Sequence, residues 1–431
     1  GSAMDPGSGS GNSHNSLMKL LLLNGHGINM HVDGAKLHIK DGRFSTTEEP
    51  QEYVFSPKRI DIDGIIIYGK SGNLTLEAIR WLIKHNVQVS ILDWNGKLLT
   101  TMLPPESTNL RTKFAQYHAF EDKEARLEIA KKFIEAKFYK SKAVLDFLSQ
   151  RYPEINFDIL DGLTKLKDVK STREILGVEG TLAGKYWIEF SKAVPKEYDF
   201  SNRIDQFRRA MGSGDMINTM LNYGYSLLEA ECLKAINSVG LDTHVGFLHE
   251  MAPSKNSLAY DLQEPFRFIV DLAVISLIES GAMESKDFIR TENYNLRLKP
   301  TGARKIVNEF SNTLNKKVSY QGKESTWSYV IFLKVRELAH YLTSKKEKLD
   351  FTKPEYEIER IDSYDIRQKI LSISYVDWKK LGFSKGTLHY MKQNAKSDKP
   401  FTLNAHVLER VNKWEALVSS QRDGRENLYF Q

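Results

Sequence analysis

The chain has 431 residues, of which 41% are hydrophobic and 11% aromatic, enough apolar content to bury the cores of two or three domains. Its formal net charge of +6 at pH 7 is compatible with a polyanionic partner but too small to demonstrate one. A single cysteine, Cys232, excludes an internal disulfide, and no apolar run reaches the ~18 residues that a membrane span needs, so we expect a cytoplasmic protein with no membrane partner.

Both ends of the chain have the composition of expression sequences. Residues 1–17 form a Gly/Ser-rich leader that resembles a cloning remnant, and the ENLYFQ within residues 421–431 resembles the remnant of a protease-recognition tag. We leave both segments out of the fold prediction and expect the native chain to begin near Met18.

Residues 18–104 predict a β-rich N-terminal domain. Short apolar runs alternate with turn signals such as VDG and KDG, and one helical segment, 73–86, lies among them. We assign dimerisation to this domain, because the apolar run GIIIYG at 64–69 needs covering and a small sheet domain has few helices to cover it. The alternative, a sheet covered by its own chain, accounts for the pattern almost as well.

After Pro104 and Pro105 the apolar pattern changes to helical spacing, which predicts an all-α domain over 109–345. Large apolar residues recur there at intervals close to three, four and seven: Phe114, Tyr117, Phe133, Ile134, Phe138, Leu145 and Leu148. Aromatic residues in this pattern indicate a packed core rather than platforms for stacked bases. The domain gives way to the charged stretch 342–359, which reads as a linker.

Within the helical domain, Glu179 lies in the sequence LGVEGTLAG. The small residues Gly180, Ala183 and Gly184 leave the surface beside this carboxylate bare enough for a bulky anionic substrate to approach. Glu179 is therefore a candidate metal ligand at a substrate-binding surface.

Three basic residues stand before the next helix: Arg203, Arg208 and Arg209. Their guanidinium groups can grip phosphates, although an ordinary solvated helix face explains three arginines nearly as well. Asp215 is placed to cap the helix that follows. Asn218 and Asn222 on this helix must find partners if they are buried, which predicts a structural hydrogen-bond network beside the active site.

The segment 246–267 carries the strongest chemical signal. His249 precedes Asp261, and Glu264 follows one helical turn later. Carboxylates three apart on a helix point the same way, and an upstream histidine can fold onto them, which predicts a hard-cation site with one nitrogen ligand. The Asp-x-x-Glu pair alone is a weak signal, but apolar runs on both sides place it in a buried setting, where unpaired charge is costly. His244 is expected to be a bystander.

The C-terminal residues 356–418 predict a helix-turn-helix domain. Asp377 is expected to cap its first short helix, Gly382 to end that helix and Ser384 to cap the second. Eight Lys or Arg against three Asp or Glu over 377–413 support DNA binding, and a small helical appendage for protein contact is the alternative. We place five residues near DNA: Lys385, Thr387, His389, Lys392 and Gln393.

Four segments together resemble the CRISPR-associated integrases that insert new spacers and the related casposases, the integrases of self-synthesising transposons: GVEG, DMINTMLNYGYSLLEAE, GFLH and SLAYDLQEPFR. The resemblance extends from about Met18 to about Leu342 and implies a prokaryotic, archaeal protein. It implies that Glu179, His249 and Glu264 hold a metal ion and that Asp261 is a fourth acidic partner in catalysis. The resemblance favours DNA contact by the three arginines above and by Arg267.

The implied reaction is DNA integration. A donor 3′-hydroxyl attacks a target phosphodiester by metal-dependent transesterification, and the target site is duplicated. The resemblance implies Mn²⁺ or Mg²⁺, and we expect Mn²⁺ to support at least as much activity, because it tolerates one imidazole among oxygen ligands better. Double-stranded DNA is the implied partner, as donor ends and target. A homodimer that forms a tetramer on DNA is implied, since two ends must be joined to opposite strands.

The C-terminal domain favours a casposase, which must recognise its own transposon ends. Two alternatives stay open. One is a CRISPR spacer-acquisition integrase or DNA endonuclease that needs a partner protein, and the other is a non-catalytic DNA-binding protein. The predicted fold class is α+β and multidomain, with a β-rich N-terminal domain, a central all-α catalytic domain and a C-terminal helix-turn-helix domain.

Overall fold

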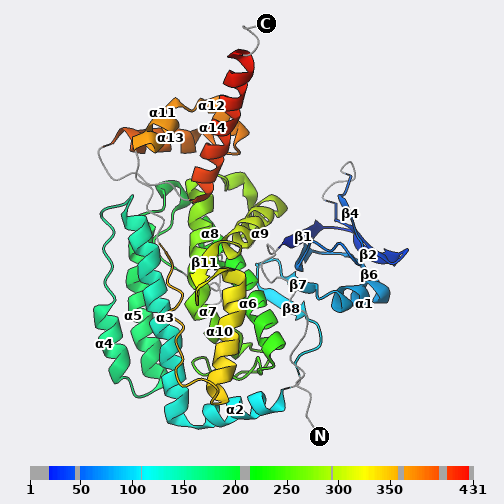
Figure 1. The fold of residues 1–431 in the computed structure, drawn as a ribbon, viewed down its shortest axis with the longest axis vertical. Helices are drawn as coiled ribbons and strands as arrows, with labels where there is room; N and C mark the ends of the chain where they lie inside the picture. Colours follow the sequence, from blue (N-terminus) through cyan, green and yellow to red (C-terminus); the bar gives the residue numbers. More distant parts are fainter. Residues whose placement is uncertain are drawn as a thin grey trace.

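The computed structural model describes residues 19–43, 49–107, 109–203, 214–292, 295–357, 364–397 and 405–426. A β-rich N-terminal domain lies beside a central helical body, and the C-terminal helices stand at one end of that body (Figure 1). This arrangement confirms the predicted α+β fold class. Among the helices described, none is long and apolar enough to cross a membrane.

Within the described part of residues 19–107, the N-terminal domain contains two four-stranded sheets. The first has the order β1 (Leu20–Gly25), β5 (Gly64–Gly69), β7 (Gln88–Leu92) and β8 (Leu98–Met102), with only β8 antiparallel to its neighbour. The second has the order β4 (Glu52–Phe55), β3 (Lys36–Lys40), β2 (Ile28–Asp33) and β6 (Gly72–Leu74). One helix, α1 (Leu76–Lys84), begins after Thr75, whose hydroxyl accepts a hydrogen bond from the Ala78 amide.

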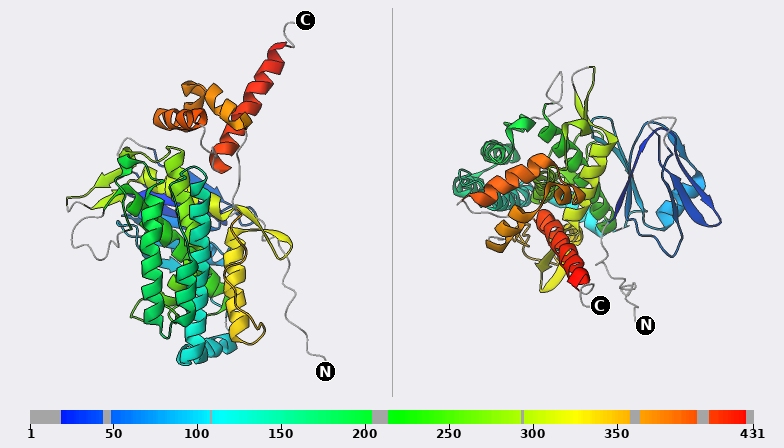
Figure 2. Two further views of the ribbon diagram at one scale, coloured as in Figure 1. Left: turned by 90° about the vertical axis from the view of Figure 1, so that its left-hand side faces the viewer. Right: turned by 90° about the horizontal axis from the view of Figure 1, so that it is seen from above.

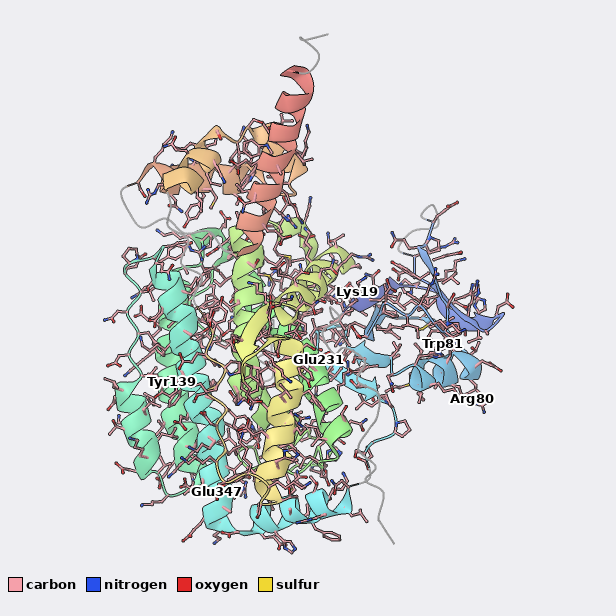
Figure 3. All side chains as sticks on the ribbon, viewed as in Figure 1. Lys19, Arg80, Trp81, Tyr139, Glu231 and Glu347 are labelled. Carbon is pink, nitrogen blue, oxygen red and sulfur yellow. The ribbon has the colours of Figure 1, made fainter. Side chains whose placement is uncertain are left out.

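The chain covers its own apolar strand β5. Successive residues of a strand point to opposite faces, and Ile65 packs in the core of the N-terminal domain while Ile66 joins the core of the helical body. On α1, Trp81 is buried in the same N-terminal core and its neighbour Arg80 faces solvent (Figure 3). The alternative that we gave for GIIIYG therefore holds, and dimerisation through this domain stays a prediction.

The helical body is built from long helices that share one core (Figure 2). Its helices are α2 (Leu110–Glu121), α3 (Lys123–Ser149), α4 (Leu160–Asp168), α5 (Thr172–Ser191), α6 (Met216–Val239), α7 (Ser257–Gln263), α8 (Arg267–Glu279), α9 (Pro300–Leu314) and α10 (Trp327–Leu342). Short 3-10 turns are η1 (Lys196–Tyr198), η2 (Glu264–Phe266) and η3 (Ser285–Asp287). Two small hairpins complete it, β9 (Phe288–Arg290) with β10 (Leu296–Leu298) and β11 (Lys317–Tyr320) with β12 (Lys323–Thr326).

Helices α6 and α8 form the centre of this body. Nearly every residue of both helices is buried, because both helices pack against neighbours on all sides. The predicted cap of α6 is confirmed, since the Asp215 carboxylate accepts a hydrogen bond of 2.7 Å from the Asn218 amide. Gly240 ends the helix with φ +88°, a conformation that favours glycine.

The stretch after α10 is not the free linker that its charge predicted. Phe351 is 1% exposed and stacks on Phe133 of α3, with ring centres 4.7 Å apart. Lys140, also on α3, donates hydrogen bonds to the carbonyl oxygens of Thr352, at 3.1 Å, and Pro354. Residues 349–356 therefore form a strap along the helical body. Its apolar side chains and carbonyl groups make contacts with α3, and these contacts hold the segment in place despite its many charged residues.

The C-terminal part contains α11 (Tyr364–Ser372), α12 (Tyr375–Lys380), α13 (Lys385–Lys396) and α14 (Ala405–Glu426). As predicted, Gly382 lies in the turn after α12 with φ +88°, and Ser384 caps α13. The predicted cap at Asp377 is wrong, because the Ser374 hydroxyl accepts from the Asp377 amide and places Asp377 inside the first turn. Helix α14 also continues past 421, where we expected the tag remnant to begin.

The strap should contribute substantially to stability. We expect Phe351→Ala to lower the free energy of unfolding of the helical body by about 3–5 kcal/mol, because it leaves a cavity against Phe133. Guanidinium denaturation followed by circular dichroism measures the change. Phe114→Ala is the matched control, since Phe114 is 59% exposed. Equal and small effects of both substitutions would show that the strap does not pack as described.

Candidate active site

An open pocket of about 850 Å³ lies between α3, α5, α6 and the segment that runs from the GFLH loop to α8. Its lining includes six cationic side chains, Lys97, Lys137, Lys140, Arg203, Lys255 and Arg267, and four carboxylates, Glu179, Glu229, Glu264 and Asp271. A pocket with this surplus of positive charge suits a polyanion, while its carboxylates provide places for a cation.

The structure brings together three of the residues predicted from sequence. Glu179 lies in the middle of α5, His249 lies in the loop before α7, and Glu264 begins the η2 turn between α7 and α8. All three line the same pocket. Pro265 follows Glu264 at a position where its missing N–H and fixed φ suit the start of a helical turn. The break between α7 and α8 thus sets where Glu264 enters the pocket.

Lys137 of α3 stands between the two glutamates. Its Nζ lies 2.5 Å from Oε1 of Glu179 and 2.7 Å from Oε2 of Glu264. Burial alone would lower the pKa of the Lys137 ammonium, but the two carboxylates reverse this effect and raise it above its ordinary value. Lys137 is therefore a charged group held in the centre of the candidate site.

Glu264 is the most enclosed of the three predicted residues, at 5% exposure. Burial opposes its charge, yet Lys137, Arg267 and His249 hold the pKa of Glu264 well below its ordinary value. Its Oε2 lies 3.4 Å from Nε of Arg267, and in the described structure neither of these two buried atoms has a partner with the angles of a hydrogen bond. Glu264 is thus ionised, buried and incompletely satisfied.

Asp261 has different partners from Glu264. Its Oδ2 accepts hydrogen bonds from the Phe247 amide at 2.5 Å and the Leu248 amide at 3.0 Å. Its Oδ1 accepts from the His249 amide at 2.9 Å and lies 2.7 Å from Nδ1 of the His249 ring. With Asp261 fully buried, both of its oxygens are engaged by the GFLH loop. The arrangement fixes the imidazole and leaves Nε2 as the ring nitrogen available to a ligand.

Gly246 belongs to the same arrangement. A Cβ atom at this position would lie 2.8 Å from Oδ2 of Asp261 and 2.9 Å from the backbone of Ser257. Only glycine lets the loop close on the carboxylate. This explains why a glycine begins the GFLH sequence.

The pocket is backed by a buried carboxylate with two phenols. Asp271 of α8 accepts hydrogen bonds of 2.6 Å from the hydroxyls of Tyr186 and Tyr225. Burial raises the pKa of Asp271 and, with the nearby carboxylate, those of both tyrosines. The guanidinium of Arg267 lies 4.4 Å from the centre of the Tyr225 ring, a cation–π contact that orients this arginine.

The predicted amide network on α6 is confirmed. Arg203 donates to Oδ1 of Asn218 at 2.6 Å and to Oδ1 of Asn222, and its guanidinium lies 5.5 Å from the Tyr225 ring centre. Arg203 is therefore fixed at the edge of the pocket. The other two arginines of that group, Arg208 and Arg209, lie outside the described residues.

The five tail residues predicted near DNA lie on α13, away from the pocket. Lys385, His389 and Gln393 are exposed and Lys392 is half-buried. Thr387 differs from these four, because it is buried against the turn after α8, where a Cβ on Gly281 would lie 1.7 Å from Oγ1 of Thr387.

The hydroxyl of Tyr390 on α13 also donates to that of Tyr152 at 2.8 Å. One face of α13 thus packs on the helical body while the other stays open. Thr387 lies on the packed face in this arrangement.

Four lysines of the pocket were not found from the sequence: Lys97, Lys137, Lys140 and Lys255. Lys137 and Lys140 both lie on α3, and burial lowers the pKa of Lys140 to about 7. A signal existed, since Lys137 stands four residues after Phe133 and next to Phe138, at positions where an amphipathic helix buries its apolar side chains. A lysine on the buried face of a helix requires polar partners, but sequence alone does not name them.

The donor set fits a divalent cation. Two carboxylates and one imidazole are ligands that Mn²⁺ and Mg²⁺ accept, and Lys137 already places positive charge between the carboxylates. Within the residues that the structure describes, no three His, Cys, Asp or Glu side chains form a ready-made metal site. The ammonium of Lys137 instead lies between two of the candidate ligands.

Comparison with known proteins identifies the class. Residues 29–312 match the family model described as CRISPR associated protein Cas1. The chain is 32% identical over 305 residues to the CRISPR-associated endonuclease Cas1 1 of Archaeoglobus fulgidus, covering 66% of this chain and 88% of the relative. It is 27% identical to the CRISPR-associated endonuclease Cas1 1 of Francisella tularensis subsp. novicida, covering 75% and 95%. The chain belongs to the Cas1 family.

Solved structures agree in fold. A Cas1 protein from Thermotoga maritima superposes with a TM-score of 0.63 at 20% identity, covering 75% of this chain and 97% of that one. A chain of a Cas6-RT-Cas1–Cas2 complex gives a TM-score of 0.62 at 19% identity, covering 81% and 37%. At these identities the likeness establishes the shared fold of the N-terminal domain and helical body.

Asp261 should be tested as the group that positions His249. We expect Asp261→Asn to lower the free energy of unfolding by about 3 kcal/mol, because an amide NH₂ would face backbone N–H groups that now bond a carboxylate. Chemical denaturation measures the loss, with Asp146→Asn as control, because the Asp146 side chain is 43% exposed and its carboxylate pairs with Lys142 near the surface. Unchanged stability in Asp261→Asn would contradict the hydrogen-bond assignment.

Proposed function

We propose that the protein is a metal-dependent DNA integrase of the casposase type, which joins donor 3′-hydroxyl ends to target DNA and duplicates the target site. The observation that carries the proposal is the convergence of Glu179, His249 and Glu264 on one pocket that is otherwise rich in cationic side chains. The family supports DNA chemistry, since the relatives from Archaeoglobus fulgidus and Francisella are named endonucleases.

Glu179, Glu264 and Nε2 of His249 would hold the cation, Mn²⁺ or Mg²⁺. Such an ion, when bound, helps to ionise the attacking hydroxyl and offsets charge on the leaving oxygen. Asp261 acts as a positioning residue, because it holds Nδ1 of His249 and keeps Nε2 directed away from the loop. Asp261 is not assigned as a fourth ligand, because its two oxygens already accept four contacts.

The chain's own residues would hold the DNA. On α5 a Cβ at Gly180 or Gly184 would meet nothing within 4 Å, so this surface beside Glu179 lets a phosphate backbone approach the helix closely. Arg203 and Arg267 are held by amide or ring contacts at the pocket and present guanidinium groups for phosphates.

The proposed reaction exchanges one phosphodiester for another. The donor 3′-oxygen forms a bond to the target phosphorus, the bond from that phosphorus to the target 3′-oxygen breaks, the attacking hydroxyl loses its proton and the leaving oxygen gains one. The number of phosphodiester bonds is conserved, and no high-energy cofactor is required. Two such events on opposite strands require two sites, which favours a homodimer that pairs further on DNA.

The C-terminal helices favour a casposase over a CRISPR enzyme. The family match ends at residue 312, whereas α11 to α14 lie beyond it and include a helix-turn-helix pair with exposed basic residues. The second candidate is a CRISPR spacer-acquisition integrase, which the names of the relatives favour and which would require a partner protein. Strand transfer by the purified protein alone distinguishes the two.

The first test is Glu179→Ala in a strand-transfer assay with a labelled donor duplex and a supercoiled plasmid. We expect transfer in Mn²⁺ to fall on the order of a hundredfold or more, because a ligand at the developing charge is lost, while DNA affinity stays within about twofold. Glu174→Ala on the exposed part of the same helix should match the wild type. Loss of DNA binding together with transfer would mean that Glu179 is structural.

A second test concerns the tail. A chain that ends at Glu357 keeps Phe351 and Tyr356, whose rings pack on the helical body, but lacks α11 to α14. We expect its preference for its own donor ends over unrelated ends to fall about tenfold or more, while transfer of unrelated ends persists. Competition assays with both duplexes measure this ratio. Unchanged end preference would refute the recognition role of the tail.

A further inference from the structure

Lys137 occupies the place where positive charge is needed most. It reaches from α3 between α5 and η2, and its ammonium contacts both candidate ligands, at 2.5 Å from Glu179 and 2.7 Å from Glu264. Its side chain is 17% exposed, so these are enclosed ion pairs rather than surface contacts. Lys137 lies in none of the four segments that indicated the family from sequence.

The two carboxylates depend on this lysine when no metal ion is bound. Like charges in one enclosed site repel, and a buried carboxylate without a cation is strongly destabilising. Arg267 offsets part of the charge of Glu264, with Nε 3.4 Å from Oε2. Within the part of the chain that the structure describes, the ion-pair partner of Glu179 is Lys137. Removal of Lys137 would leave a site of excess negative charge.

Lys137 cannot keep this position beside a bound divalent cation. A cation held by Glu179 and Glu264 would lie within a few ångströms of the ammonium, whichever carboxylate oxygens it used. At about 4 Å a charge of +2 and a charge of +1 repel strongly in a partly buried site. The long, flexible lysine side chain can swing away, and it lines the same open pocket in which phosphates would bind.

We propose that Lys137 is an exchangeable counter-ion of the metal site, which neutralises Glu179 and Glu264 before the metal binds and is then displaced into the pocket, toward a DNA phosphate. The inference rests on the proposed metal-dependent function and assigns it a further residue. In the free protein, Lys137 therefore competes with the metal for the two carboxylates. Bound DNA accepts the displaced ammonium and so strengthens metal binding, and bound metal strengthens DNA binding by the same factor.

The experiment is a titration of the full chain with Mn²⁺, in which electron paramagnetic resonance measures the free ion. Lys137→Met keeps the apolar stem and removes the charge, and we expect its Kd for Mn²⁺ to be about tenfold lower than that of the wild type, or lower still. Lys142→Met is the matched control on α3, because Lys142 forms a half-buried ion pair with Asp146 and does not line the pocket, and its Kd should equal the wild-type value.

A donor duplex with 3′-hydroxyl ends provides the second measurement. We expect DNA to lower the wild-type Kd for Mn²⁺ severalfold and to leave that of Lys137→Met nearly unchanged. Lys137→Gln serves in the same role if the methionine variant does not fold, and thermal unfolding with and without Mn²⁺ checks both, because Mn²⁺ should raise the melting temperature of the variants more than that of the wild type.

The outcomes separate this inference from the function on which it rests. If Mn²⁺ binds the wild type and not Glu179→Ala, but binds Lys137→Met no more tightly than the wild type, the role of Lys137 is overturned while the metal site stands. If Mn²⁺ does not bind the wild type with or without DNA, the metal-dependent function fails, and the inference fails with it.

Discussion

Two enclosed carboxylates that face each other require positive charge between them, and the packing of the helical body places a lysine ammonium there. Glu179 on α5 and Glu264 on η2 meet at the Nζ of Lys137 on α3, so three segments distant in sequence are tied by one ammonium group. Glu264 is buried and ionised, and its charge is stabilised by this contact. The proposed chemistry uses the same constraint, with a divalent cation as the alternative source of charge.

Other buried polar groups around the two glutamates fix the remaining parts of the site. Asp261 uses both oxygens to close the GFLH loop, and thereby directs His249 toward the pocket. Asp271 and its two tyrosines support the helix that carries Arg267. On α3, Lys140 donates hydrogen bonds to carbonyl groups of the strap and so holds the strap against the wall of the pocket. Asp261, Asp271 and Lys140 thus each have polar partners, and these partners determine which side chains remain available to a substrate.

The sequence indicated those features that depend on local chemistry. Asp215 and Ser384 cap their helices because a short polar side chain can bond the first turn, whatever the tertiary structure. The assignment of Glu179, His249 and Glu264 as metal ligands came from the family resemblance. The structure places all three on one pocket, and their role as ligands stays a prediction. The sequence did not predict the role of Lys137, because that role depends on how α3 packs against α5 and η2. The sequence did not predict the strap for a similar reason. Its charged composition indicated a free linker, but the stacking of Phe351 on Phe133 is a tertiary contact that the local sequence does not show.

The most direct measurement is anomalous diffraction from crystals of the full chain soaked in Mn²⁺, with data collected at the manganese absorption edge. The account predicts one strong anomalous peak per protomer among Glu179, Glu264 and Nε2 of His249, with the Lys137 side chain moved away from the carboxylates. A peak elsewhere, or no peak among these three residues with Lys137 still between both glutamates at saturating Mn²⁺, would contradict the claim that this pocket is a metal-dependent active site.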